Sequence, residues 1–203
     1  MTVDQTDKEV DMASEQRADR RTKAPNIVRT LLEFALALAL ALALTWVIKT
    51  FVVEPYEVPT SSMEATIMTG DKLLAEKITL HMGPVKNGEI VVFADKVKPD
   101  RILVKRVIAI GGQVVDFRDG TVYVDGEPLY EPYARGIRTL PLEQHHENMT
   151  INYPYTVPEG QLWVMGDNRE NSADSRYFGT IAEDSLYGKA IMVFWPFDHI
   201  GPL

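Results

Sequence analysis

The chain contains one long apolar run, which lies near its N-terminus. From residue 31 to residue 53, 19 of the 23 positions are hydrophobic, and Thr45 is the only polar side chain between Phe34 and Ile48. Its repeated Ala-Leu pairs alternate as a strand does, but both residues are apolar and both favour helix. As a helix the run is about 34 Å long, enough to cross the ~30 Å hydrocarbon core of a bilayer. The pattern predicts a single transmembrane helix over residues 27–53.

Two other kinds of segment have similar apolar runs. A cleaved signal peptide would end in a small-x-small motif, whereas Lys49-Thr50-Phe51-Val52-Val53 follows Ile48 here. A helix in the core of a soluble protein is rarely apolar on every side without interruption. An uncleaved membrane anchor therefore fits the run best.

Charged residues before the run predict its orientation. Residues 1–26 hold almost no large apolar side chains, and we expect them to form a disordered tail. Because basic flanks stay on the cytoplasmic side, we expect a single-pass protein of the cell membrane with a cytoplasmic N-terminus. Residues 54–203 would then form an extracytoplasmic domain. Five basic residues crowd toward the run: Arg17, Arg20, Arg21, Lys23 and Arg29.

After Pro55 the hydrophobic positions fall into short runs rich in Val, Ile, Tyr and Phe. Asp119-Gly120 and Asp125-Gly126 separate such runs, and Asp-Gly between β-rich segments is a strong hairpin signal. The expected fold class is therefore mainly β, an antiparallel β-sheet domain preceded by the single N-terminal transmembrane helix. Expected strands cover residues 89–93, 102–108, 114–117, 121–124, 162–165 and 190–195.

Composition excludes several kinds of chemistry. The sequence has no cysteine, so it has no disulfide, no thiolate metal site and no cysteine nucleophile. The net charge is −8, and residues 1–53 hold as many acids as bases, so the whole excess lies in residues 54–203. Nucleic-acid binding needs clustered Lys and Arg, and we do not expect it here.

The four histidines show no catalytic or metal-binding motif. His145 and His146 are adjacent in a polar stretch and point in different directions, so a solvated loop is expected there. His81 and His199 have no motif around them. The sequence leaves a Ser-His-Asp triad open but offers nothing in its favour.

Two polar segments are more informative. Residues 58–66 place Thr60, Ser61 and Ser62 in a row after the predicted anchor, although an ordinary turn would do the same. Residues 166–176 form a dense polar stretch directly after an apolar strand, which suits either a hydrogen-bonded network or a solvated loop.

A lysine lies inside the otherwise apolar strand that contains Val104-Lys105-Arg106-Val107. If Lys105 faces inward, desolvation lowers its pKa and leaves part of it neutral near pH 7. A neutral amine can take the proton from a serine hydroxyl, which makes a nucleophile without histidine. The alternative is that Lys105 only extends along a sheet edge to reach water.

Together and in this order, these segments resemble bacterial type I signal peptidase (leader peptidase), a family of Ser–Lys dyad serine proteases. The resemblance covers the anchor and nearly all of residues 54–203. It implies a membrane-bound endopeptidase that cleaves N-terminal signal peptides from exported preproteins after small residues, of the Ala-x-Ala type.

The resemblance also implies roles for individual residues. Ser62 matches the nucleophile of the family and Lys105 its general base. Thr60 matches the hydroxyl residue that joins the Ser62 backbone amide in the oxyanion hole. Ser172 matches the serine that hydrogen-bonds the lysine and holds it in position.

Further residues are implied around the site. Asp174 and Arg176 match a structural ion pair of the family. We expect the substrate to bind in an extended form, with pockets lined by Val58, Met63, Ile67, Leu103 and Val104. No metal or cofactor is expected, the partners would be preproteins bearing signal peptides and the lipid bilayer, and the protein would be a monomer.

Two other functions stay open at this point. A self-cleaving repressor-type protease has the same Ser–Lys chemistry, but such proteins are cytoplasmic and lack an anchor. A membrane-tethered binding module without catalysis would need Ser62 and Lys105 to lie far apart in space.

Overall fold

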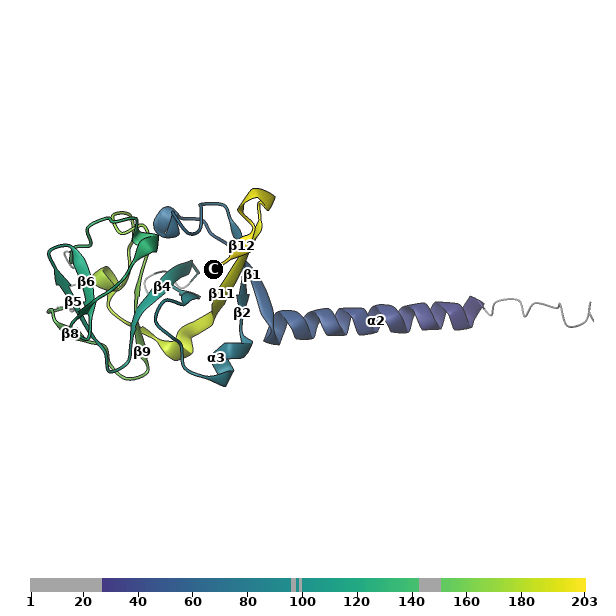
Figure 1. The fold of residues 1–203 in the computed structure, drawn as a ribbon. Helices are drawn as coiled ribbons and strands as arrows, with labels where there is room; N and C mark the ends of the chain where they lie inside the picture. Colours follow the sequence, from purple (N-terminus) through teal and green to yellow (C-terminus); the bar gives the residue numbers. More distant parts are fainter. Residues whose placement is uncertain (1–26, 96–97, 99, 143–150) are drawn as a thin grey trace, which may run out of the picture. The chain divides into compact units, whose positions relative to one another are not determined.

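The computed structural model describes residues 27–95, 98, 100–142 and 151–203 (Figure 1). The expected tail, residues 1–26, and the histidine pair His145-His146 lie outside the described residues. The chain forms two compact units, Met1–Val47 and Ile48–Leu203.

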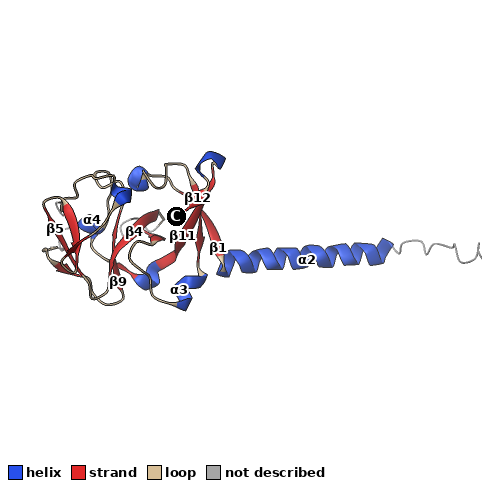
Figure 2. Ribbon diagram, in the orientation of Figure 1, coloured by secondary structure: helices blue, strands red, loops and turns tan. Residues whose placement is uncertain are grey.

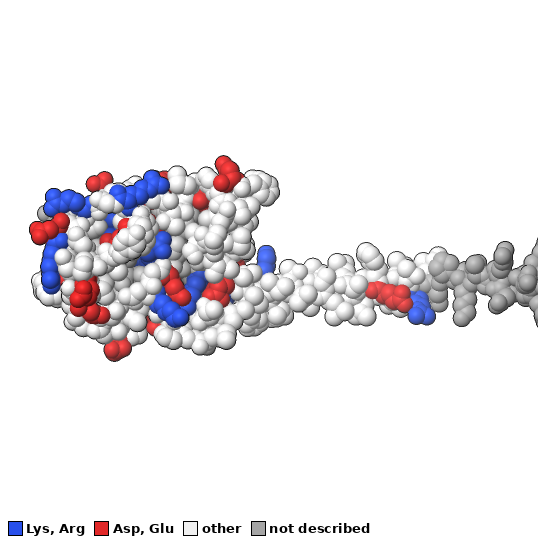
Figure 3. All heavy atoms as spheres, in the orientation of Figure 1, with Lys and Arg blue, Asp and Glu red and all other residues white. Residues whose placement is uncertain are grey.

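One helix, α2 (Ile27–Phe51), is long and apolar enough to cross a membrane. Its 25 residues span about 37 Å, and every side chain along it is exposed. In Figure 3 charged side chains occur on this helix only near its ends. The sequence pattern predicted that the helix ends at Val53, whereas α2 ends at Phe51. Val53 is already part of the first strand, where it pairs with Glu76 of the next strand.

The larger of two antiparallel sheets has eight strands in the order β1-β2-β11-β3-β4-β9-β10, and β12 pairs with β11 (Figure 2). Short helices connect the strands: α3 (Ile78–Met82), α4 (Ser175–Phe178) and the 3₁₀ turns η1 (Ser61–Met63), η2 (Pro132–Ala134), η3 (Glu183–Ser185) and η4 (Phe197–His199). The strands are β1 (Val53–Glu57), β2 (Lys72–Glu76), β3 (Ile90–Ala94), β4 (Ile102–Ile110), β9 (Gln161–Met165), β10 (Ile181–Ala182), β11 (Leu186–Trp195) and β12 (Gly201–Pro202).

The smaller sheet has the order β7-β6-β5-β8. Both expected hairpins are confirmed, because β5 pairs with β6 across Asp119-Gly120 and β6 pairs with β7 across Asp125-Gly126. All four turn residues have positive φ angles between 52° and 84°, which suits Asp-Gly hairpin turns. The strands are β5 (Val114–Arg118), β6 (Thr121–Val124), β7 (Glu127–Pro128) and β8 (Tyr155–Thr156).

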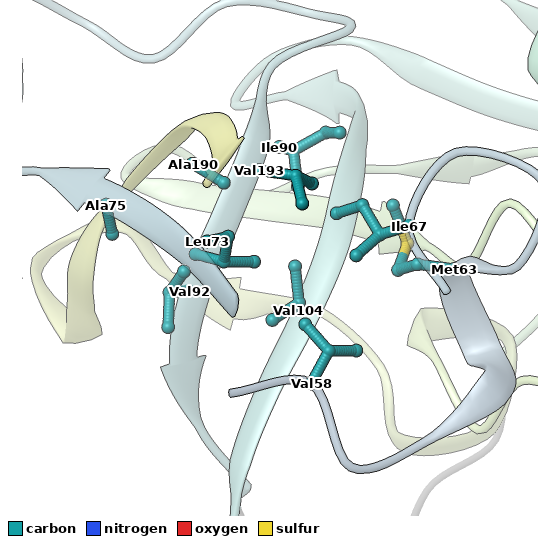
Figure 4. Close-up of a cluster of buried hydrophobic side chains, with 10 residues drawn as sticks. All are labelled: Val58, Met63, Ile67, Leu73, Ala75, Ile90, Val92, Val104, Ala190 and Val193. Atoms are coloured by element: carbon teal, nitrogen blue, oxygen red, sulfur yellow. The ribbon is translucent and has the colours of Figure 1, made fainter. Parts of the chain in front are cut away.

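Three clusters of buried apolar side chains hold these sheets together. The first gathers side chains of β2, β3, β4 and β11 and of the turn after β1, where it includes Val58, Met63 and Ile67 (Figure 4). The second gathers side chains of β3, β4, β9 and α4. The third joins the small sheet to the ends of β4 and β9 around Trp163. The small sheet is therefore fixed to β4, which carries Lys105, and to β9, which leads into the polar segment 166–176.

Substitution of Trp163 tests this junction. The ring is fully buried and packs edge-on against Tyr153, with centroids 5.9 Å apart. Trp163→Ala should lower the free energy of unfolding by about 3–5 kcal/mol, because it leaves a large cavity between the two sheets. Trp163→Phe should cost much less, since the indole N–H has no hydrogen-bond partner among the described residues. Thermal unfolding of both variants measures the difference, and equal losses would argue against this packing.

Candidate active site

Ser62 lies in the 3₁₀ turn η1, directly after the extended residue Thr60. The turn is closed by a backbone hydrogen bond from Glu64 to the Ser61 carbonyl oxygen at 3.0 Å, and in the next turn Thr66 and Ile67 donate to the Met63 carbonyl oxygen at 3.0 and 2.9 Å. Val58 before the serine and Met63 and Ile67 after it are buried in the first cluster, so apolar packing anchors the turn on both sides of the serine. The three hydroxyl residues Thr60, Ser61 and Ser62 therefore lie on a turn that packing holds in place.

Lys105 lies in the middle of β4, where it pairs with Val91 of β3. Its side chain is 1% exposed, so it does not extend along a sheet edge to water. The amine Nζ lies 2.5 Å from Ser62 Oγ and donates to the Val104 carbonyl oxygen at 3.1 Å. Two residues 43 positions apart in the sequence are thus in direct contact, which a binding module without catalysis would not require.

The surroundings of Lys105 favour a neutral amine. Burial lowers the pKa of Lys105 from its ordinary value to about 8, while the carboxylate of Asp174 acts in the opposite direction. With this pKa, on the order of a tenth of the amine is unprotonated at pH 7, and the fraction rises with pH. An unprotonated amine at this distance can accept the Ser62 hydroxyl proton.

The two hydroxyl residues that were expected to support this pair lie next to it. Thr60 Oγ1 is 3.4 Å from Ser62 Oγ. Ser172 Oγ is buried and has no hydrogen-bond partner among the described residues, so the expected hydrogen bond to Lys105 is not formed in this structure. Ser172 instead packs against Gly166, which lies between it and the Ser62 carbonyl oxygen.

The polar segment after β9 is a buried network rather than a solvated loop. Arg176 binds Asp174 through Nε and Nη2, both at 2.9 Å, and both residues are at most 1% exposed. The Asp174 carboxylate also accepts a hydrogen bond from the Gly166 backbone N–H at 3.1 Å. Asn168 donates its backbone N–H to the Ser62 carbonyl oxygen at 3.1 Å. The network therefore holds the peptide backbone directly behind the serine.

A second buried ion pair was not expected from the sequence. Arg106, next to Lys105, donates to both carboxylate oxygens of Asp167 at 2.9 and 2.7 Å. Thr66 of the serine turn donates to the same carboxylate at 2.5 Å. The only sequence signal was indirect. An arginine inside an apolar strand needs a buried acid as its partner, but the sequence does not identify which acid that is.

Four of the five residues expected to line substrate pockets lie in one cluster. Val58, Met63, Ile67 and Val104 all belong to the first apolar cluster, and Figure 4 shows Val58 beside Val104 and Met63 beside Ile67. Leu103 differs, because side chains alternate along β4 and its own packs in the second cluster. Its side chain does not share a cluster with the other four.

Among the described side chains, His199 is a histidine with a side-chain partner. Its Nδ1 lies 2.7 Å from a carboxylate oxygen of Asp71, and this hydrogen bond raises the pKa of His199. Ser62 Oγ has Lys105 and Thr60 as its partners, so the structure lends no support to a Ser-His-Asp triad. Within the described ranges no three His, Asp or Glu side chains gather as a metal site would require.

Close approach at Gly166 gives a test of the network. A methyl group on its Cα would overlap the Ser62 carbonyl oxygen and the Ser172 side chain. Gly166→Ala should therefore destabilise the domain by about 1–3 kcal/mol, since the surrounding backbone has to move. Gly83→Ala is a matched control, because open space surrounds its Cα. Thermal unfolding of both variants is the measurement, and equal stability would contradict the tight contact.

Comparisons with known proteins show which family the chain belongs to. The model of the family "Signal peptidase, peptidase S26" matches residues 31–195. The chain is similar to a probable signal peptidase I-1 of Synechocystis sp., with 37% identity over 171 residues, 79% of this chain and 80% of that protein. It is also similar to signal peptidase I T of Bacillus subtilis, with 35% identity over 191 residues, 93% of this chain and 98% of that protein.

A solved structure is also similar to part of the chain. It is a signal peptidase I of Enterococcus faecalis, with 30% sequence identity and a TM-score of 0.43. The match covers 53% of this chain and 97% of that chain. The assignment itself follows from the family match over residues 31–195 and from relatives similar over most of their length. The chain belongs to the signal peptidase family, peptidase S26, and is a serine endopeptidase of the signal peptidase type.

Proposed function

We propose that Ser62 and Lys105 form the catalytic dyad with which this protein cleaves signal peptides from exported preproteins. The observation that carries the proposal is the 2.5 Å contact between Ser62 Oγ and the amine of a lysine that is 1% exposed. A lysine in that setting has a pKa of about 8, low enough for it to act as a base.

The reaction would proceed in two steps. Neutral Lys105 takes the Ser62 proton as Oγ attacks the carbonyl carbon of the scissile bond, and the resulting ammonium then protonates the leaving amine of the mature protein. The signal peptide stays esterified to Ser62 until a water, deprotonated by Lys105, hydrolyses the ester. The Ser62 backbone N–H and the Thr60 hydroxyl would stabilise the oxyanion in both steps.

Ser172 would stabilise the protonated state of the base. After proton transfer the Lys105 ammonium has three N–H donors, of which the Val104 carbonyl oxygen accepts one. Ser172 Oγ is buried and unpartnered within the described part of the chain, so it is free to accept another. We propose that Ser172 forms this hydrogen bond when the lysine becomes charged, and that Asp174 and Arg176 hold the surrounding backbone in place.

Cleavage after small residues would follow from the packing beside the serine. The proposed pocket residues Val58, Met63, Ile67 and Val104 are each at most 6% exposed, so little space is left for a large side chain. Leu103 would contribute its backbone rather than its side chain. Among the described strands β1 lies at the end of the large sheet, and an extended substrate can add to such an edge. This supports specificity of the Ala-x-Ala type.

The helix α2 would act as a single-pass anchor with its N-terminus in the cytoplasm. Signal peptides are themselves apolar, so an anchor confines enzyme and substrate to one plane and raises their effective concentration. The catalytic domain would then face the extracytoplasmic side. Trp195 and Phe197 are 45% and 75% exposed, and such aromatic side chains suit contact with a lipid surface.

Substitution of the dyad tests the proposal. Ser62→Ala, Lys105→Met and Lys105→Arg should each lower kcat/KM for a preprotein by at least about 1000-fold, because the nucleophile or the neutral amine is lost and guanidinium keeps its proton. Ser61→Ala and Lys189→Arg are matched controls that alter a neighbouring serine and another buried lysine, and they should stay within about threefold of wild type. The measurement is cleavage of a preprotein by detergent-solubilised enzyme. Turnover near the wild-type rate in folded Ser62→Ala would refute the dyad.

The pH dependence tests the state of the lysine. Because the reactive form of Lys105 is unprotonated and its pKa is lowered to about 8, kcat/KM should rise as pH increases toward 8 and level off above it. Initial rates between pH 6 and 10, in buffers of constant ionic strength, measure this limb. A rate independent of pH over that range would count against Lys105 as the base.

A further inference from the structure

One segment that does not belong to the proposed active site contacts the three buried arginines of the polar network. Residues 131–140, here called the clamp segment, lie in the sequence between β7 and β8 of the small sheet. The arginines Arg106, Arg169 and Arg176 lie in or beside the polar network and are at most 9% exposed. Each of them has at least one partner in the clamp segment, although that segment carries none of the motifs found in the sequence.

The strongest of these contacts joins Glu131 to Arg169. The guanidinium donates to the two carboxylate oxygens at 2.9 and 2.5 Å, and the same Nη1 donates to Thr139 Oγ1 at 2.9 Å. Arg169 is 2% exposed, so its charge has little access to water. Its Nε donates to the Gly166 carbonyl oxygen at 2.9 Å. Glu131 therefore neutralises the arginine that holds the backbone at Gly166.

The second contact is between the Tyr133 ring and Arg106. The guanidinium carbon of Arg106 lies 4.1 Å from the ring centroid, within range of a cation–π interaction, and that of Arg169 lies at 5.7 Å. Arg106 follows Lys105 in β4 and holds Asp167 through two hydrogen bonds. The Tyr133 ring therefore covers the ion pair next to the proposed base.

These contacts continue to the serine turn. Gly166 packs against the Ser62 carbonyl oxygen, Asn168 donates to that oxygen, and Thr66 donates to Asp167. At the far end of the clamp segment, the Leu140 carbonyl oxygen accepts from Arg176 at 3.2 Å. A displacement of Glu131 or Tyr133 would thus reach Ser62 through one arginine and one stretch of backbone.

We propose that Glu131 and Tyr133 are positioning residues that hold Ser62 and Lys105 at reacting distance, and that the small sheet serves to deliver them. The inference rests on the proposed roles of Ser62 and Lys105. Among the described residues, the hydrogen-bond, ion-pair and ring partners found for the side chains of Glu131 and Tyr133 are Arg169, Arg106 and each other, all of them in the polar network. Their loss should therefore affect the chemical step more than substrate binding, and the signature is a lower kcat at an unchanged KM.

Tyr133 gives the sharper test. Tyr133→Leu removes the ring but keeps an apolar side chain, and a misplacement of about 1 Å between reacting groups can cost on the order of 100-fold in rate. We expect kcat to fall about 10- to 100-fold with KM within about twofold of wild type. Tyr133→Phe keeps the ring over Arg106 and should stay within about threefold. Tyr130→Leu, at a side chain that is 85% exposed, is the matched surface control and should have no effect.

Glu131→Gln is the independent variant. It keeps the shape of the side chain but leaves the Arg169 charge buried without its counter-ion, so kcat should fall at unchanged KM as well. Glu131→Asp restores the charge and should recover part of the lost rate. All rates are measured on a preprotein below the unfolding temperature of each variant, which thermal unfolding determines.

The outcomes separate this inference from the proposed function. Cleavage by wild type and its loss in Ser62→Ala establish the dyad, and failure of either concerns the dyad alone. With the dyad established, a folded Tyr133→Leu with wild-type kcat, an equal loss in Tyr133→Phe, or an increase in KM alone would overturn the inference. If Tyr133→Leu does not fold, Glu131→Gln is judged by the same criteria, and if neither folds, the clamp segment is structural and the inference is wrong.

Discussion

The structure depends on keeping one lysine amine out of water. Lys105 is held in the middle of β4, with strands on both sides and 1% of its surface exposed. Burial of an ammonium is costly, so the environment lowers the pKa of Lys105 to about 8 and makes the neutral amine easier to reach than in water. The same burial fixes the position of the amine relative to Ser62, because the side chain is held in a packed strand. A central strand therefore sets both the protonation state and the position of the proposed base.

A buried amine of this kind needs polar surroundings that do not move. Three arginines near it are each neutralised by a carboxylate: Arg106 by Asp167, Arg169 by Glu131 and Arg176 by Asp174. Buried ion pairs contribute little net stability, but they tolerate little displacement once formed, because an unpaired buried charge is very unfavourable. The three ion pairs are therefore better explained as contacts that fix the backbone behind Ser62 than as contacts that stabilise the fold.

Local patterns predicted much of the fold and only part of the site. The apolar helix, six strands and both Asp-Gly hairpins follow from residue preferences that act over a few positions. Strand β2 escaped prediction because Lys72-Leu73-Leu74-Ala75-Glu76 consists of residues that favour helix, and its pairing with β1 and β11 overrides that preference. Glu131 and the Asp71–His199 pair had no local signal at all. Each is defined by a partner far away in the sequence.

The sequence by itself determined the chemistry that is available. The absence of cysteine, one lysine in an apolar strand and a row of hydroxyls after an apolar helix pointed to a Ser–Lys pair, and these are properties of composition and short-range pattern. The resemblance to the signal peptidase family then singled out Ser62 and Lys105. Only the tertiary structure decided that the two side chains touch, that Leu103 packs apart from the other pocket residues, and that Ser172 is buried without a partner. Distances between segments depend on how the sheets pair and pack, and that is fixed by the whole set of long-range contacts rather than by any one stretch of chain.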